Sequence, residues 1–165
     1  MLAVSASLQT VSEILGSEIE VGAINSPRSV VLSAGREVCE QSRARLRREG
    51  VGSKLLDVSL AFHSRLMEPI WDRYQALMSS ARFQASKIAF VSTVTGELVG
   101  ETNAEIWGKG LCGTVEFSRA VETMSGLGAT TLLEIGPHAS LLPMMAECAP
   151  KARVAASLYQ GRGER

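Results

Sequence analysis

The order of the apolar segments over residues 1–58 constrains the fold of this 165-residue chain more than any other feature. Four short apolar runs have the length of strands, at residues 1–4, 19–25, 30–32 and 54–58. Two segments with helical spacing of apolar side chains lie between them, at residues 7–15 and 36–49. The resulting order β-α-β-β-α-β is that of the ferredoxin-like split motif. We therefore predict a ferredoxin-like α+β subdomain over residues 1–58.

Residues 59–160 carry a different pattern, and residues 161–165 form a polar tail. Helical spacing predicts helices at residues 65–80, 115–124 and 140–146. Apolar runs predict strands at residues 88–91, 130–135 and 154–158, with a loop around Trp107. Two buried strands separated by a helix favour a parallel β-α-β unit. These elements are too few for a stand-alone doubly wound sheet, so we expect the chain to be part of a larger α/β fold.

Composition excludes several classes of function. The 17 basic and 17 acidic side chains cancel, so the chain has no field that would steer it to nucleic acid or to anionic lipid. No apolar run approaches the ~18–20 residues of a spanning helix, and no secretory signal is recognisable, which predicts a cytoplasmic protein. Three scattered cysteines and two histidines make neither a zinc site nor a disulfide framework. We therefore expect no metal and no bound cofactor.

The two histidines are the side chains most suited to proton transfer near neutral pH. His63 lies between a strand end and the helix predicted at residues 65–80, where Ser64 can act as the N-cap. His138 follows Gly136-Pro137 at the end of a predicted strand, where it can equally be an ordinary turn residue. No nucleophile accompanies them, because the elbow pattern G-x-S-x-G is absent and Ser33 follows a valine where the first glycine is required. A cysteine–histidine pair stays open.

Four segments resemble the motifs of one family, in that family's order. They are Val21–Ser33, which is similar to "A-x-N-x-P-x-x-V-V-(I/V/L)-S-G", Ala61-Phe62-His63-Ser64 to "(H/Y)-A-(F/S)-H-S", Phe90–Gly96 to "F-x-S-T-V-T-G", and Leu133–His138 to "(V/L)-E-(V/I)-G-P-H". Together they resemble malonyl-CoA:acyl-carrier-protein transacylases and the acyltransferase domains of polyketide synthases. The resemblance implies an α/β-hydrolase-like large subdomain interrupted by a ferredoxin-like small one. Residues 1–58 would correspond to the small subdomain and residues 59–160 to the C-terminal part of the large one.

The resemblance also implies a ping-pong acyl transfer from acyl-CoA to the phosphopantetheine thiol of an acyl carrier protein. In this family a serine attacks the thioester and a histidine is its base, which assigns that role to His63. Phe62, Ala61 and Asn25 match positions at the acyl pocket, and a phenylalanine at position 62 favours malonyl. Leu60 departs from the histidine with which the malonyl box usually begins. His138 and Ser64 are expected to orient or support the site.

The same resemblance places the elbow serine, the carboxylate-binding arginine and the oxyanion donors upstream of the small subdomain. We therefore expect the isolated chain to have no transacylase activity and to need the N-terminal half or adjoining synthase domains. An alternative function is a non-catalytic module that docks the acidic carrier protein. The arginine-rich segment 36–49 would be its docking surface.

Overall fold

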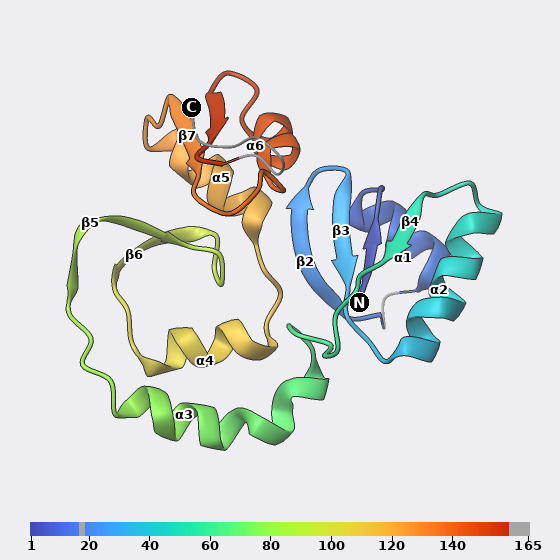
Figure 1. The fold of residues 1–165 in the computed structure, drawn as a ribbon, viewed down its shortest axis with the longest axis horizontal. Coiled ribbons are helices and arrows are strands. Elements are labelled where there is room, and N and C mark those ends of the chain that lie inside the picture. Colours follow the sequence, from blue (N-terminus) through green and yellow to red (C-terminus); the bar gives the residue numbers. More distant parts are fainter. Residues whose placement is uncertain (17–18, 159–165) are drawn as a thin grey trace.

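The computed structural model describes residues 1–16 and 19–158 (Figure 1). The predicted tail and the last two residues of the second predicted unit lie outside the described residues. None of the helices within the described ranges is long and apolar enough to cross a membrane.

The N-terminal part has the predicted order of elements. These are β1 (Leu2–Val4), α1 (Leu8–Leu15), β2 (Val21–Ser26), β3 (Ser29–Leu32), α2 (Arg36–Arg48) and β4 (Ser53–Leu55). Their four strands form one antiparallel sheet in the order β2-β3-β1-β4, and both helices cover the same side of it (Figure 1). The prediction of a ferredoxin-like arrangement is confirmed.

The core of this part forms because alternate residues of neighbouring strands face the helices. Leu2 pairs with Leu32 and Val4 with Val30, so their side chains share one face of the sheet. Val11 of α1, together with Cys39 and Leu46 of α2, completes a cluster whose members are at most 2% exposed. Burial of each large aliphatic side chain contributes about 1.5–3 kcal/mol to folding. Ser7 caps α1 by accepting the Thr10 N–H, and Gly16 ends that helix with a φ of +91°.

The second part contains one 3-10 helix, four α-helices and four strands within its described residues. They are η1 (Arg65–Ile70), α3 (Trp71–Ser79), β5 (Ala85–Ser92), β6 (Glu97–Glu101), α4 (Ala104–Cys112), α5 (Phe117–Gly126), β7 (Thr131–Glu134), α6 (Leu142–Cys148) and β8 (Arg153–Ala156). β5 and β6 form an antiparallel hairpin, and β7 and β8 form a parallel pair joined through α6. A second core, smaller than the first, gathers around Val121, Leu132, Met145 and Ala149.

Three predictions in this part are wrong: the loop around Trp107, the choice of strands in the parallel unit, and the burial of the strand at residues 88–91. The segment around Trp107, predicted as a loop, is the helix α4. Its N-cap Asn103 accepts the Ile106 N–H. The sequence pattern missed this helix because Gly108 and Gly110 are poor helix formers. The predicted parallel β-α-β unit forms from β7, α6 and β8 rather than from the strands at residues 88–91 and 130–135, because β5 pairs with β6. The helix predicted at residues 65–80 forms, but its first turns are the 3-10 helix η1, which contains Pro69.

The strand predicted as buried at residues 88–91 is also exposed. Ile88 on β5 is 84% exposed, and Ile135 after β7 is 83% exposed. Further large apolar side chains are exposed on α3, β6 and α4, namely Leu77, Leu98 and Trp107. Figure 1 shows α3, β5, β6 and α4 in an open arc, and β7 apart from this arc beside α5 and α6. We call the exposed apolar side chains of this arc the uncovered apolar face; they are Leu77, Ile88, Leu98 and Trp107. Exposed apolar surface of this kind marks contact with further polypeptide.

A short extended segment joins the second part to the small sheet. Val115 pairs with Ala23 of β2 in a parallel bridge. The Ile24 N–H donates to the Val115 carbonyl at 2.9 Å, and the Val115 N–H donates to the Gly22 carbonyl at 2.9 Å. Thr114 adds a hydrogen bond from its hydroxyl to the Val21 carbonyl at 2.7 Å. The C-terminal end of α4 is thereby held against the edge of the ferredoxin-like sheet.

Candidate active site

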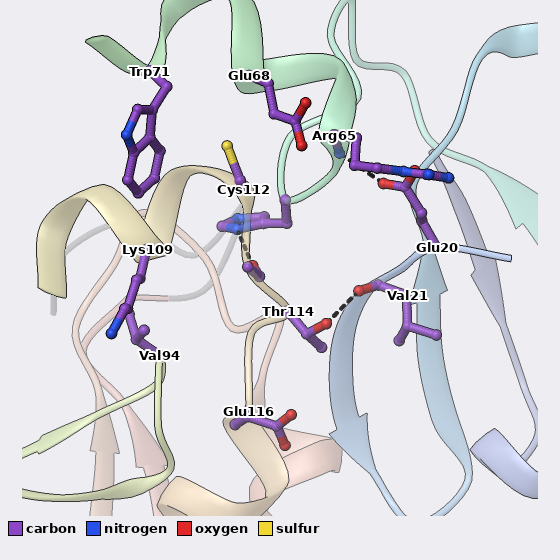
Figure 2. Close-up of a pocket in the computed structure, with 12 residues that line it drawn as sticks. Glu20, Val21, Arg65, Glu68, Trp71, Val94, Lys109, Cys112, Thr114 and Glu116 are labelled. Carbon is purple, nitrogen blue, oxygen red and sulfur yellow. Dashed lines mark hydrogen bonds and ion pairs between the residues drawn. The ribbon is translucent and has the colours of Figure 1, made fainter. Parts of the chain in front are cut away.

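A cavity of about 620 Å³ lies where η1 and α4 meet the edge strand β2. Twelve residues line it: Glu20, Val21, His63, Arg65, Glu68, Trp71, Val94, Lys109, Cys112, Gly113, Thr114 and Glu116. Figure 2 shows side chains from η1, α3, α4 and the strand edge converging on this space. Of the residues predicted as functional, the cavity contains His63.

The backbone at His63 is held in an uncommon conformation. Its φ is +59°, the left-handed region, which costs a residue with a side chain roughly 1–2 kcal/mol. Its N–H donates to the Leu111 carbonyl at 3.1 Å, one of the carbonyls that the end of α4 leaves without a helical partner. The left-handed turn is thus stabilised by a contact with α4. Strain of this kind is typical of functional positions.

The His63 imidazole is oriented by the same helix end. Its Nδ1 lies 3.2 Å from the carbonyl oxygen of Gly113, the C-cap of α4. A carbonyl only accepts hydrogen bonds, so in the neutral ring Nδ1 carries the proton and donates it. Nε2 then has a free lone pair. The half-buried imidazole is therefore prepared to accept a proton at Nε2, as a general base must.

Ser64 caps the helix that follows His63, as predicted. It is 2% exposed, and its hydroxyl donates to the Ala61 carbonyl at 2.6 Å while accepting the Leu66 N–H at 3.3 Å. It is the N-cap of η1, so it closes the turn that presents His63.

Glu20 is a residue of this site that sequence reasoning missed. Its carboxylate accepts the Arg65 backbone N–H at 2.7 Å and the Arg65 Nε–H at 2.6 Å, as the dashed lines in Figure 2 show. The pair ties the residue before β2 to the start of η1, two positions after His63. No local pattern could have revealed it, because the partners are 45 positions apart in the sequence.

The remaining charges of the cavity are predominantly acidic. Lys109 pairs with Glu105 at 2.6 Å, and Arg65 pairs with Glu20. Glu68 and Glu116 add two further carboxylates to the lining. Each cation that lines the cavity therefore already has a carboxylate partner, and an anionic substrate group would have to displace one of these partners or be bound by a cation from elsewhere.

Cys112 is the nucleophilic side chain in the cavity, but its thiol is not activated. Burial raises the pKa of the Cys112 thiol, and the nearby Glu68 carboxylate raises it further. Reactive thiols have a lowered pKa, so this environment disfavours the cysteine–histidine alternative. Ser33 is fully buried after β3, and its hydroxyl donates to the Phe62 carbonyl. Neither residue serves as a partner of His63 in the described structure.

The other predicted residues lie outside this cavity. Phe62 is 40% exposed, and Ala61 lines a separate hollow with Leu60. Asn25 is on β2, where its carbonyl accepts the Cys148 thiol at 3.5 Å. His138 is exposed in the loop between β7 and α6. His63 and Ser64 thus lie together at the start of η1, and the functional roles of all six residues stay predictions.

Glu134, rather than His138, holds the loop between β7 and α6. Its carboxylate is 8% exposed and accepts the Ser140 N–H at 2.9 Å and the Leu141 N–H at 3.0 Å. Burial by itself would raise the pKa of the Glu134 carboxyl, but these donors and the Ser140 hydroxyl hold it below its usual value. The carboxylate is therefore a structural acceptor. Within the described residues no three His, Cys, Asp or Glu side chains gather to hold a metal ion.

The fold and the oriented imidazole together define a class of protein: a mixed α/β domain with a histidine held at the junction of its two parts. Comparison with known proteins makes the assignment specific. The chain belongs to the acyl transferase domain family, whose model matches residues 1–159. The resemblance seen in the sequence motifs is confirmed.

The relatives are much longer than this chain. It is 32% identical over 171 residues to polyketide synthase GfsA of Streptomyces halstedii, matching 100% of this chain and 2% of that protein. The acyltransferase domain from the second module of the salinomycin polyketide synthase has 31% identity and a TM-score of 0.90, covering 98% of this chain and 39% of its own. A malonyl CoA-acyl carrier protein transacylase from Clostridium perfringens shares the fold, with 20% identity, a TM-score of 0.86, and coverage of 96% and 53%.

Proposed function

We propose that this chain is part of a polyketide-synthase-type acyltransferase domain, in which His63 is the general base for malonyl transfer from coenzyme A to an acyl carrier protein. The observation that carries the proposal is the hydrogen bond between His63 Nδ1 and the Gly113 carbonyl, which leaves Nε2 free to accept a proton. Phe62, directly before the base, supports malonyl through its match to the family motif. The three free thiols suit a reducing, cytoplasmic compartment.

The proposed chemistry has two half-reactions. In the first, Nε2 of His63 takes the proton of a serine hydroxyl as its oxygen attacks the malonyl thioester carbon. The C–S bond then breaks, and the imidazolium gives its proton to the departing coenzyme A sulfur. In the second, Nε2 takes the proton of the phosphopantetheine thiol, whose sulfur attacks the serine ester. The C–O bond breaks and the proton returns to the serine oxygen, so no proton or electron is left unbalanced.

We further propose that the chain does not catalyse this reaction alone. Among the described residues no hydroxyl or thiol is hydrogen-bonded to His63, and the cavity's cations are already paired. The serine and a cation for the malonyl carboxylate would come from polypeptide outside these 165 residues. The uncovered apolar face supports this, since the remainder of an acyltransferase domain would bury it.

A chimera tests the proposal. The matched 39% of the salinomycin second-module domain is replaced by this chain, and malonyl transfer to a carrier protein is followed by mass spectrometry. The chimera should be active, and His63→Ala should lower kcat by about 10²–10⁴-fold. The 165-residue chain alone should show no transfer. Transfer by the chain alone, with the acyl group on one of its own serines, would contradict the proposal, and so would an unaffected His63→Ala chimera.

A second candidate function is a carrier-protein-docking module without catalysis. The observation that favours it is the basic outer surface of α2, whose arginines are exposed. The reading frame upstream of Met1 separates the two candidates. An in-frame G-H-S-x-G within about one hundred codons favours the acyltransferase, whereas its absence combined with an inactive chimera favours the module.

A further inference from the structure

The turn at residues 61–66, which we call the histidine turn, is held from both sides by the sheet of the N-terminal part. Before the histidine, the Ser33 hydroxyl at the end of β3 donates to the Phe62 carbonyl. After it, the Glu20 carboxylate at the start of β2 accepts the Arg65 backbone N–H at 2.7 Å (Figure 2). The two holding residues are joined to each other, because the Ser33 N–H donates to the Glu20 carbonyl at 2.9 Å.

The backbone of His63 gives these two contacts a physical task. A φ of +59° is strained for a residue with a side chain, and such a conformation persists only where its surroundings over-determine it. The hydrogen bonds of Ser64 lie within the turn itself, and the Leu111 carbonyl holds the His63 N–H from α4. Ser33 and Glu20 add the contacts that fix the two flanks of the turn to the sheet.

Contacts of the same kind join the two parts at the other end of β2. There the buried Ser26 hydroxyl donates to the Glu147 carboxylate of α6, which also pairs with Arg28 at 2.6 Å. The ion pair of Glu20 with Arg65 has the same length, and both carboxylate side chains are 26% exposed. The two ends of β2 therefore differ in what they hold, since one holds α6 and the other holds the histidine turn.

We propose that Ser33 and Glu20 are positioning residues for His63. By accepting from and donating to the two flanks of the histidine turn, they keep its left-handed backbone and with it the contact between Nδ1 and the Gly113 carbonyl. Ser33 is fully buried and Glu20 is engaged by Arg65, so both act through the turn rather than on a substrate. The kinetic consequence of this orientation rests on the proposed function, whereas the orientation itself does not.

Nitrogen-15 NMR tests the orientation without any chemistry. The 165-residue chain is labelled at its two histidines, and the tautomer of His63 is read at a pH where its ring is neutral. Wild type should hold the proton on Nδ1. Ser33→Ala/Glu20→Ala should lose this single tautomer and give an averaged signal, because the turn is then free to leave its strained conformation.

The matched control is Ser26→Ala/Glu147→Ala, which removes the same chemical groups at the other end of β2. It also loosens the joint between the two parts, but it should leave the His63 signal as in wild type. Glu20→Gln is the conservative variant. Its amide oxygen still accepts the Arg65 N–H, so it should keep the wild-type tautomer that Glu20→Ala loses.

The kinetic arm uses the chimera of the proposed function. Ser33→Ala/Glu20→Ala should lower kcat by about 10–10²-fold and change the KM for malonyl-CoA by less than about threefold, because a misplaced base slows the chemical step more than it weakens binding. The control pair Ser26→Ala/Glu147→Ala should turn over like the unsubstituted chimera.

Each remaining outcome decides the inference. Circular dichroism checks the fold, and if Ser33→Ala/Glu20→Ala unfolds the chain, the two single variants replace it with the same expected loss. An averaged His63 signal in wild type, an unchanged signal in the double variant, or an equal change in the control would overturn the inference. So would an equal loss in Glu20→Gln and Glu20→Ala, or a changed signal with unchanged kcat. The NMR result needs no activity, so it stands or fails independently of the His63→Ala chimera that tests the proposed function.

Discussion

The Nδ1 of His63 lies 3.2 Å from the carbonyl oxygen of Gly113, fifty positions further along the chain. A backbone carbonyl here does what a carboxylate does in many catalytic histidine pairs: it fixes the tautomer and the ring orientation. Because the carbonyl belongs to the end of α4, and α4 is held to β2 through Val115, the orientation of the His63 imidazole depends on the junction between the two parts of the chain.

The first prediction concerns the His63 tautomer. Nitrogen-15 NMR at a pH where the imidazole of His63 is neutral should show the proton on Nδ1 and a free lone pair on Nε2. The reason is that Nδ1 faces the Gly113 carbonyl, which can only accept a hydrogen bond. His138 is the internal control, since its exposed ring has no described partner and should exchange between tautomers. A proton on Nε2 of His63 would contradict the proposal that His63 is the base.

A second prediction separates the core from the uncovered apolar face. Leu46→Ala should lower the free energy of unfolding by about 2–5 kcal/mol, because Leu46 is fully buried in the core of the small sheet. Leu77→Ala, at a side chain that is 63% exposed, should change it by less than about 0.5 kcal/mol. Urea unfolding followed by circular dichroism measures both. A large loss at Leu77 would show that its face is covered in solution.

Gly22 provides a third prediction, at the point where β2 approaches the chain before His63. A Cβ at this position would lie 2.9 Å from the Ser33 Cβ and 3.6 Å from the Phe62 carbonyl oxygen. Gly22→Ala should therefore cost about 1–3 kcal/mol of stability through overpacking. Gly100→Ala is the matched control, since a Cβ there meets no atom within 4 Å. Thermal unfolding of the two variants should differ clearly, and equal midpoints would refute the predicted clash.

The fourth prediction is a pH dependence from the contact between α6 and the β2–β3 turn. Hydrogen bonds from the Ser26 hydroxyl and from Arg28 hold the pKa of the Glu147 carboxyl below its usual 4.5. A folded-state pKa below the unfolded one gives stability that is complete above about pH 4.5 and is lost as the pH falls through the folded value. Glu147→Gln should flatten this acid-side loss, measured as unfolding midpoints across that range.

The control for this experiment is Glu101→Gln, an exposed carboxylate on β6 without a described partner. It should leave the pH dependence of unfolding as in wild type. If Glu101→Gln flattens the acid-side loss as much as Glu147→Gln does, the loss does not come from the contact between α6 and the turn.

Sequence patterns alone determined the order of elements in the small sheet and the cap at Ser64, and they singled out His63 as a candidate. These features follow from periodicity and from turn and cap residues, which are local along the chain. Tertiary structure alone decided that Gly113 holds the His63 ring, that Glu20 lines the same cavity and that β5 is exposed. Contacts between residues 45 or 50 positions apart, and the presence or absence of a covering element, depend on how distant segments pack. No local pattern of apolar and polar residues encodes that packing.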